Sequence, residues 1–288
     1  MTVPMELTAA RLVSPRRHTR IAAAPRWPSL GLAELYRHRG LLWFLAWRNV
    51  KVRYTQTVLG AAWAMIQPVF TMVVFTMVFG RFARIPSDGA PYAVFSLAAL
   101  VPWTYFSSAL SGASGSLVSS TNLITKVYFP RLVIPTAAIA AGLVDFAIAF
   151  GVLIVVLLAN GIMPSPLALL VVPILLVIML ATAAGVGCWL GALHVRYRDI
   201  RYITAFLLHI WMYVSPVVYP SSVVPAQYRW LLNVNPMTAV IEGFRAVLIG
   251  TTEVPWVGIA CAAATSGVML VAGVMFFRRA ERAFADVV

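Results

Sequence analysis

Side chains that could bind a nucleotide are scarce in this chain. A phosphate-binding loop needs glycines whose backbone amides face the phosphates, followed by a lysine that reaches them. The sequence has only two lysines, Lys51 in NVKVR and Lys126 in ITKVY, and neither follows a glycine-rich loop. We therefore expect this chain to bind no ATP through such a loop and to carry no cofactor or metal ion.

Ionisable side chains inside apolar segments could couple transport to an ion or take part in catalysis. Asp145 and His209 are the clear candidates. For Asp145, capping a backbone group or pairing with a neighbouring helix is favoured over ion coupling, and for His209 ordinary packing is favoured. The sequence contains no cluster of carboxylates or histidines, so we identify no catalytic residue.

Aromatic side chains are abundant inside the apolar segments, and their rings can stack on sugar faces without holding them tightly. Trp211 and Tyr213 lie mid-segment, where a position at the membrane–water interface does not explain them. Contact with lipid or with other helices explains each ring as well as a polymer path does. The candidates for a channel lining are Trp63, Phe70, Trp211, Tyr213 and Tyr219.

The composition places these residues in a membrane. Of the 288 residues, 61% are hydrophobic and 11% are charged, whereas soluble domains carry about 25% charged residues. We therefore predict an all-α integral membrane protein with six transmembrane helices, each long enough for the ~30 Å apolar core of a bilayer. The predicted spans are 58–82, 91–114, 132–159, 166–193, 203–219 and 254–277.

The net charge of +13 is distributed along the chain between the apolar spans. This alternation argues against a nucleic-acid partner, which would need one basic face. Only four of the 22 basic residues, Arg81, Arg84, Arg229 and Arg245, fall in outer segments if the N-terminus is inside. The positive-inside rule therefore predicts that both termini are cytosolic.

A basic, tryptophan-rich stretch, 34–54, precedes the first span. As a helix it is apolar on two sides, which fits a position between lipid and a protein partner. Its arginines could hold anionic headgroups or a pyrophosphate. The candidate side chains are Trp43, Trp47, Arg48, Lys51, Arg53 and Tyr54.

Two connecting segments have features of their own. The inner loop TNLITKVYFPRLVIP predicts a short helix over 121–128 that Pro130 stops, with exposed Tyr128 and Phe129 as a docking surface. A plain connecting loop is the alternative.

Between the fifth and sixth spans, Asn235 can cap a helix that Pro236 begins and Gly250 ends. Its apolar residues form one face, and Glu242 and Arg245 lie on the other. We expect this amphipathic helix at or in the outer leaflet, where it pairs with the short piece 228–232 as a re-entrant hairpin.

Four motifs resemble the membrane subunit of ABC-2-type polysaccharide exporters, the permeases for O-antigen, teichoic acid and galactan. In order, they are LLWFLAWRNVKVRYTQTVLGAAWAMIQP, NLITKVYFPRLVIP, YVSPVVYP and LNVNPMTAVIEGFRAVLIG, within residues 34–279. The resemblance implies a homodimer in a bacterial inner membrane, joined to two copies of a separate ATPase that binds ATP and magnesium. It also implies export of a polysaccharide carried on undecaprenyl pyrophosphate.

The resemblance also implies an organisation. The interface helix (31–57) precedes the transmembrane domain (58–277), which contains a coupling loop (116–131) and outer helices (221–250). The composition, and not the resemblance, predicts a mobile cytosolic tail (1–30), and the charge distribution predicts a cytosolic C-terminus (278–288). Glu242 and Arg245 would belong to an outer gate. The residues that would contact the ATPase are Thr121, Leu123, Lys126, Tyr128, Phe129, Arg131, Arg196, Arg198 and Arg201.

The expected function is ATP-driven export of a lipid-linked glycan of O-antigen or galactan type. An ABC-2 exporter of a small drug or lipid is the nearest alternative. A membrane-embedded glycan-processing enzyme is a further alternative, for which Asp145 alone is weak support.

Overall fold

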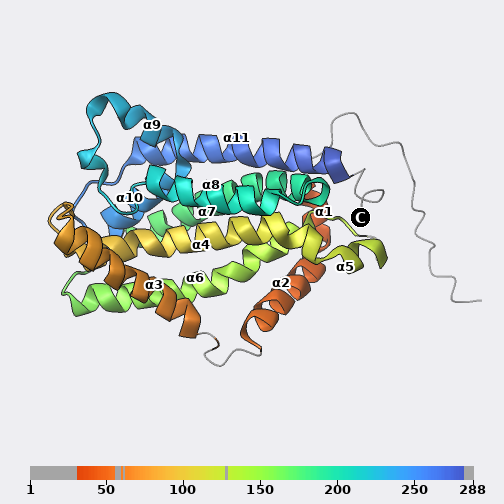
Figure 1. Ribbon diagram of the computed structural model, residues 1–288, viewed down its shortest axis with the longest axis horizontal. Helices are drawn as coiled ribbons and strands as arrows, with labels where there is room; N and C mark the ends of the chain where they lie inside the picture. Colours follow the sequence, from red (N-terminus) through yellow and green to blue (C-terminus); the bar gives the residue numbers. More distant parts are fainter. Residues whose placement is uncertain (1–30, 56–59, 61, 127–128, 282–288) are drawn as a thin grey trace, which may run out of the picture.

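The computed structural model describes residues 31–55, 60, 62–126 and 129–281, and this part of the chain is helical without strands (Figure 1). The expected N-terminal tail, Tyr128 and the last seven residues lie outside it. The longer elements are α2 (Arg39–Tyr54), α3 (Ala62–Phe75), α4 (Tyr92–Ser119), α6 (Val133–Ala159), α7 (Ala168–Arg196), α8 (Ile200–Val214), α10 (Pro236–Leu248) and α11 (Trp256–Ala280). The shorter ones are α1 (Leu32–Arg37), the π-helical turn η1 (Thr76–Phe82), α5 (Thr121–Lys126), η2 (Ser221–Val223), η3 (Ala226–Tyr228) and α9 (Arg229–Val234).

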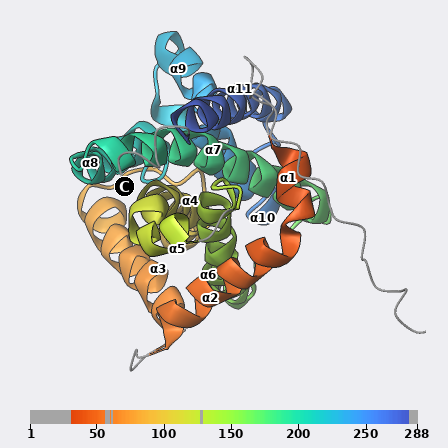
Figure 2. The same ribbon diagram turned by 90° about the vertical axis from the view of Figure 1, so that its right-hand side faces the viewer.

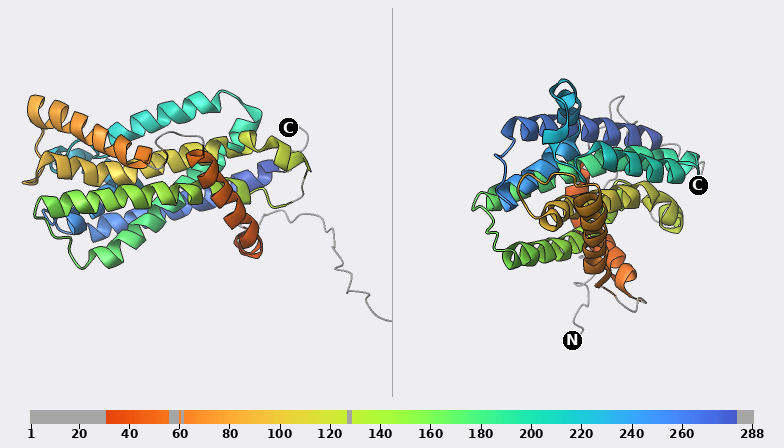
Figure 3. Two further views of the ribbon diagram at one scale, coloured as in Figure 1. Left: turned by 90° about the horizontal axis from the view of Figure 1, so that it is seen from below. Right: turned by 60° about the vertical axis from the view of Figure 1, so that its left-hand side comes forward.

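Five helical segments within the described ranges are long and apolar enough to cross a membrane. They are α3 continued by η1, α4, α6, α7 and α11. In Figure 1, α4, α6, α7 and α11 run roughly along the long axis of the bundle, and α3 lies at a slant to them, as it does in the left view of Figure 3. The expected fifth span, 203–219, overlaps α8 instead, whose 15 residues fall short of the roughly 20 that a span needs. Pro216 disfavours helical geometry at Ser215, which is extended, so α8 ends there. The fifth predicted span, and with it the total of six, therefore stays a prediction.

The centre of the bundle is α4. In its most apolar stretch, 78% of the residues are buried inside the protein, against 6% for α3 and η1. Its neighbours are α6, α7, α10 and α3, and Figure 2 shows α4 enclosed by them in the end-on view. The main apolar core follows this helix, with Phe106, Leu110 and Ala113 fully buried.

Small residues set the closest helix contacts, as the four-residue spacing of Gly187 and Gly191 predicts. A Cβ atom at Gly187 would lie 2.7 Å from the Ala113 side chain of α4. A Cβ atom at Gly273 of α11 would lie 1.9 Å from the carbonyl oxygen of Gly185 in α7. These glycines therefore pack helices of the same chain against one another.

A second apolar core lies at the end of the bundle where α2 crosses it (Figure 2). Leu45 and Ala46 of α2 pack there with Phe129, Leu132 and Phe277. α2 therefore rests against α6 through one buried face rather than standing apart from the bundle.

The contact at Gly273 can be tested by adding one methyl group. Because Gly273→Ala would place its Cβ against the Gly185 backbone, overpacking should lower the free energy of unfolding by about 1–3 kcal/mol. The matched control is Gly267→Ala in the same helix, where nothing lies within 4 Å of the new Cβ. Unfolding of the purified protein in detergent measures both; equal stability of the two variants would show that α7 and α11 are not in close contact at Gly273.

Candidate functional site

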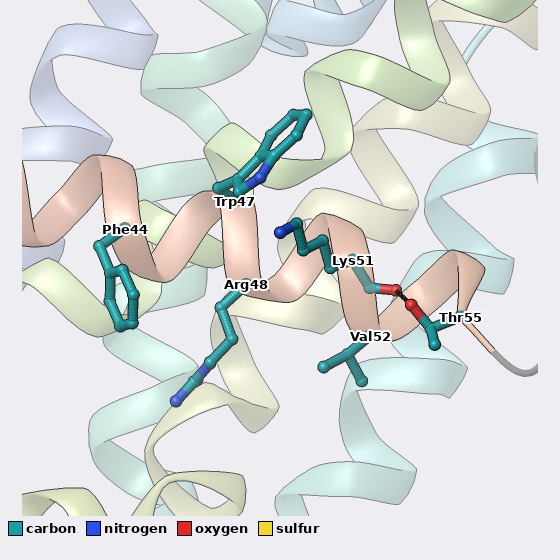
Figure 4. A pocket seen from close by; sticks show the side chains of 6 residues that line it. All are labelled: Phe44, Trp47, Arg48, Lys51, Val52 and Thr55. Carbon is teal, nitrogen blue, oxygen red and sulfur yellow. Dashed lines mark hydrogen bonds between the residues drawn. The ribbon is translucent and has the colours of Figure 1, made fainter.

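The outward face of α2 combines rings with positive charges. Phe44, Trp47, Arg48 and Lys51 border a shallow groove of about 350 Å³, and Figure 4 shows the rings and cations fanning out from the helix. The rings of Trp43 and Trp47 stack with centroids 6.2 Å apart. This face can contact an apolar layer and anionic groups together, because the rings are exposed and the cations stand among them.

Two side chains at the end of α2 contact the bundle instead. The Arg53 guanidinium forms an ion pair with the Asp145 carboxylate of α6, and the Tyr54 hydroxyl donates a hydrogen bond to the same carboxylate. The prediction that Asp145 pairs with a neighbouring helix is confirmed. Arg53 and Tyr54 therefore hold α2 to α6, whereas Arg48 and Lys51 stay on the outward face; binding of a lipid pyrophosphate by these residues stays a prediction.

Charged groups also connect the start of the described chain to its end. Arg278 of α11 pairs with Glu34 of α1. Glu281 accepts a hydrogen bond from the Arg131 backbone amide at 3.1 Å, and its carbonyl accepts one from Arg131 Nη1 at 2.7 Å. Burial raises the pKa of the Glu281 carboxyl, and the bond from Arg131 opposes that rise. Sequence reasoning missed these contacts because the partners are far apart in the chain.

The expected ATPase-docking surface is only partly exposed. Phe129 is buried, with 8% of its surface accessible, so its prediction as an exposed docking residue is wrong. Its ring instead fills the second core beside Leu132. Thr121 and Leu123 lie half-buried in α5, and Arg131 is held by Glu281.

Exposed basic side chains remain near that surface, on α5 and around the turn between α7 and α8. They are Lys126, Arg196, Arg198 and Arg201. A partner protein could reach these four side chains.

The expected channel aromatics divide into two groups. Trp63 and Phe70 on α3 and Tyr213 on α8 are exposed, at 54%, 67% and 61%. Trp211 is half-buried: its Nε1 donates to Asn235 Oδ1 at 2.8 Å, and its ring meets Phe106 edge-on at 5.0 Å. Packing and hydrogen bonding therefore account for Trp211.

Tyr219 also has an internal partner. Its hydroxyl donates to the carbonyl oxygen of Tyr213 at 3.1 Å, within the chain reversal that follows α8. Of the five expected rings, those of Trp63, Phe70 and Tyr213 are the ones open to a neighbour.

The N-terminus of α10 is as predicted. Asn235 Oδ1 accepts the Met237 amide at 3.1 Å, and Pro236 occupies the first turn. The same Asn235 donates to Ser215 Oγ at 2.9 Å, so it also joins α10 to the end of α8.

The side of α10 that carries Glu242 and Arg245 is largely buried within the described protein, and the place of this helix at or in the outer leaflet stays a prediction. Arg245 is 4% accessible and donates to the carbonyls of Pro216 at 2.7 Å, Val217 at 2.9 Å and Phe95 at 3.3 Å. Its guanidinium also lies 3.5 Å from the centroid of the Phe95 ring. Because backbone carbonyls satisfy its donors, the charge can be buried between α10, α4 and the turn after α8.

Glu242 lies one turn before Arg245 and is partly buried. It borders a hollow of about 150 Å³ together with Asp88, Ser221 and Thr252. Glu242 thus lies beside Arg245, which three backbone carbonyls hold in place, and this position suits a structural role. An outer gate at Glu242 and Arg245 stays a prediction.

Residues 40–249 match the sequence profile of the family described as ABC-2 type transporter. The chain belongs to the ABC-2 type transporter family. It is 29% identical over 255 residues to an O-antigen export system permease from Myxococcus xanthus, covering 88% of this chain and 97% of that protein. The corresponding permease of Klebsiella pneumoniae is 24% identical over 241 residues, covering 83% and 92%.

A polysialic acid transport protein of Escherichia coli is also similar. It is 24% identical over 198 residues, which cover 68% of this ABC-2 chain and 76% of the relative. Three relatives named for saccharide transport thus align over most of their length.

The buried arginine yields a stability prediction. Arg245→Leu leaves the carbonyls of Pro216, Val217 and Phe95 without their donor, so the free energy of unfolding should fall by about 3 kcal/mol. Arg229→Leu is the control, because Arg229 is exposed and its guanidinium hydrogen-bonds the carbonyl oxygen of Val224 at the surface. Unfolding in detergent compares the two variants; a loss at Arg229 as large as that at Arg245 would contradict this account of Arg245.

Proposed function

We propose that this chain is the permease subunit of an ATP-driven exporter that moves an undecaprenyl-pyrophosphate-linked polysaccharide of O-antigen or galactan type. The cargo would pass from the cytosolic to the outer side of a bacterial inner membrane. The observation that carries the proposal is the near full-length similarity of this ABC-2 chain to permeases named for O-antigen export.

The arrangement of α2 supports a lipid-linked cargo. Its aromatic and basic groove could contact acyl chains and a diphosphate at the same level of the membrane. Lys51 and Arg48 present unburied charge there, and Phe44 and Trp47 present rings. A cargo with both an apolar tail and an anionic head matches this combination better than a purely apolar drug does.

The exposed faces of α3 and α8 support a homodimer. Trp63 and Phe70 on α3 and Tyr213 on α8 leave their rings open, and α3 is the least buried of the long helices. We infer that two copies face each other through these helices and that the polymer passes between them along the rings.

The exposed arginines between α7 and α8 support docking of a separate ATPase. With both termini cytosolic, Arg196, Arg198 and Arg201 would lie on the cytosolic side with α5. Closure of the two ATPase copies on ATP would then act on α5 and on this turn.

Depletion of the chain in its native bacterium is the main test. We expect full-length polysaccharide on undecaprenyl pyrophosphate to accumulate at the inner face, because synthesis continues while export stops. Extraction of lipid-linked glycans, combined with labelling of each membrane face, measures this. Shortened polymer would indicate a role in synthesis, and normal glycan on both faces would favour export of a small molecule.

A charge-reversal experiment tests the ATPase contact. The double variant Arg198→Glu, Arg201→Glu should weaken co-purification of the ATPase by about tenfold or more, since like charges then face each other. Arg229→Glu is the control, because Arg229 is also exposed and is predicted to lie on the opposite side of the membrane. Unchanged association in the double variant would place the ATPase elsewhere.

A further inference from the structure

A cavity of about 330 Å³ lies between α2, α3, α4 and α6, with a mainly apolar lining that carries several polar side chains. It has the size of a small-ligand site. Its polar groups are Arg53 and Tyr54 of α2, Asp145 of α6, Gln67 of α3 and hydroxyl groups of α4, and its apolar lining includes Trp63 and Phe146. Asp145 is the only carboxylate in the five long helices that the structure describes. Because it borders this cavity, we consider it as a ligand-binding group.

The charges in the cavity cancel each other. Arg53 and Asp145 form an ion pair, and both side chains keep contact with the exterior, at 41% and 23% accessibility. A carboxylate has about four acceptor positions and a guanidinium has five donors. The pair together with the Tyr54 hydroxyl uses only some of them, so both groups can still hydrogen-bond a ligand.

The α4 hydroxyls add acceptors. Thr104, Ser107 and Ser108 donate to carbonyls of their own helix, at 2.8 Å, 3.1 Å and 3.0 Å. Each oxygen therefore has lone pairs left for a donor from the cavity. The wall combines these acceptors with the donors of Arg53.

Gln67 and Trp63 complete the set from α3. The Gln67 side chain is exposed and has no hydrogen-bond partner among the described residues. An amide without a partner is costly in an apolar surrounding. The Trp63 indole, 54% accessible, offers a flat face one turn away.

We propose that this cavity binds a neutral sugar ring of the exported glycan, with Asp145 and Gln67 hydrogen-bonding its hydroxyls and Trp63 stacking on its face. The proposal rests on the proposed function, because it names the part of that cargo which the cavity takes. A sugar ring carries many hydroxyl groups and no charge. It therefore suits a lining that offers hydrogen-bond donors and acceptors but no net charge, because Arg53 and Asp145 neutralise each other. A diphosphate would be repelled by the Asp145 carboxylate beside Arg53.

A reporter cysteine in the cavity tests this binding in the full transporter complex. Ser108→Cys is made with Cys261→Ser, so that the buried Cys188 is the remaining native thiol. The probes are the methyl glycosides of glucose, galactose, mannose and N-acetylglucosamine, each alone, and inorganic pyrophosphate. We expect at least one glycoside to slow labelling by a water-soluble maleimide. A reporter at Val257→Cys, exposed on α11 away from the cavity, should label at a constant rate.

Two further substitutions identify the recognising groups. Gln67→Leu should weaken protection by about fivefold and Asp145→Asn by about tenfold, since each removes hydrogen bonds to the ligand. If Asp145→Asn loosens α2, Gln67→Leu is the decisive variant, because the Gln67 side chain has no hydrogen-bond partner among the described residues. Protection that survives Gln67→Leu unchanged would overturn the assignment.

The remaining outcomes separate this site from the proposed function. Protection by pyrophosphate alone would make the cavity an anion site and overturn the proposal, and protection by no glycoside would also overturn it. If depletion blocks glycan export while labelling is never slowed, only the sugar site fails. If glycosides protect but depletion leaves glycans normal on both faces, the cavity binds sugar and the export function fails.

Discussion

Close contact between α4 and α7 is the constraint on which the other positions depend. Apolar helices gain little by exchanging lipid for one another, so association in a bilayer needs close approach of small residues and satisfied polar groups. Gly187 lies so near Ala113 that a side chain would not fit. On its other side, α7 meets α11 through Gly185 and Gly273 in the same way. These two contacts fix three helices, and α10 then packs against all three.

The helices outside this close-packed group have a different character. α3 contacts α4 and α6 but leaves most of its surface open, and α8 leaves Phe206 and Tyr213 exposed. Lipid can cover these rings, but it cannot pair the Gln67 amide. An exposed amide in an apolar helix is best explained by a polar partner that hydrogen-bonds it. The proposed second protomer and the proposed sugar ligand are both such partners for α3.

Much of the helix placement could be predicted from the sequence, because long apolar stretches and caps are local signals. The predicted span 132–159 is α6 (Val133–Ala159), and Asn235 caps α10 as expected. The pairing of charges could not be predicted. Arg245 bonds carbonyls of residues 95, 216 and 217, which only the folded turn after α8 brings together. A helix with Glu and Arg on one side therefore had the pattern of a surface helix and proved to be buried.

Phe129 illustrates a second limit of the same kind. An aromatic residue beside Lys126 and Arg131 suits a docking surface and a core equally well in sequence. The difference is made by Leu45 and Phe277, which approach it from opposite ends of the chain. The candidate cavity was missed for a related reason, since Asp145 signalled a helix partner without indicating which helix, and Gln67 had no pattern that set it apart.

The attachments of α2 have a mechanical consequence. Its start follows α1, which Glu34 ties to Arg278 of α11, its middle is buried through Leu45 and Ala46, and its end is tied to Asp145 of α6. A half-exposed ion pair with solvated partners stabilises a structure by typically less than about 1 kcal/mol. The buried apolar face of α2, by contrast, would become exposed only if the whole helix separated from the bundle. The end at Arg53 is therefore the part of α2 that can detach at the lowest cost. Because that end borders the cavity, a ligand that hydrogen-bonds Asp145 contacts the same carboxylate that attaches α2 to α6.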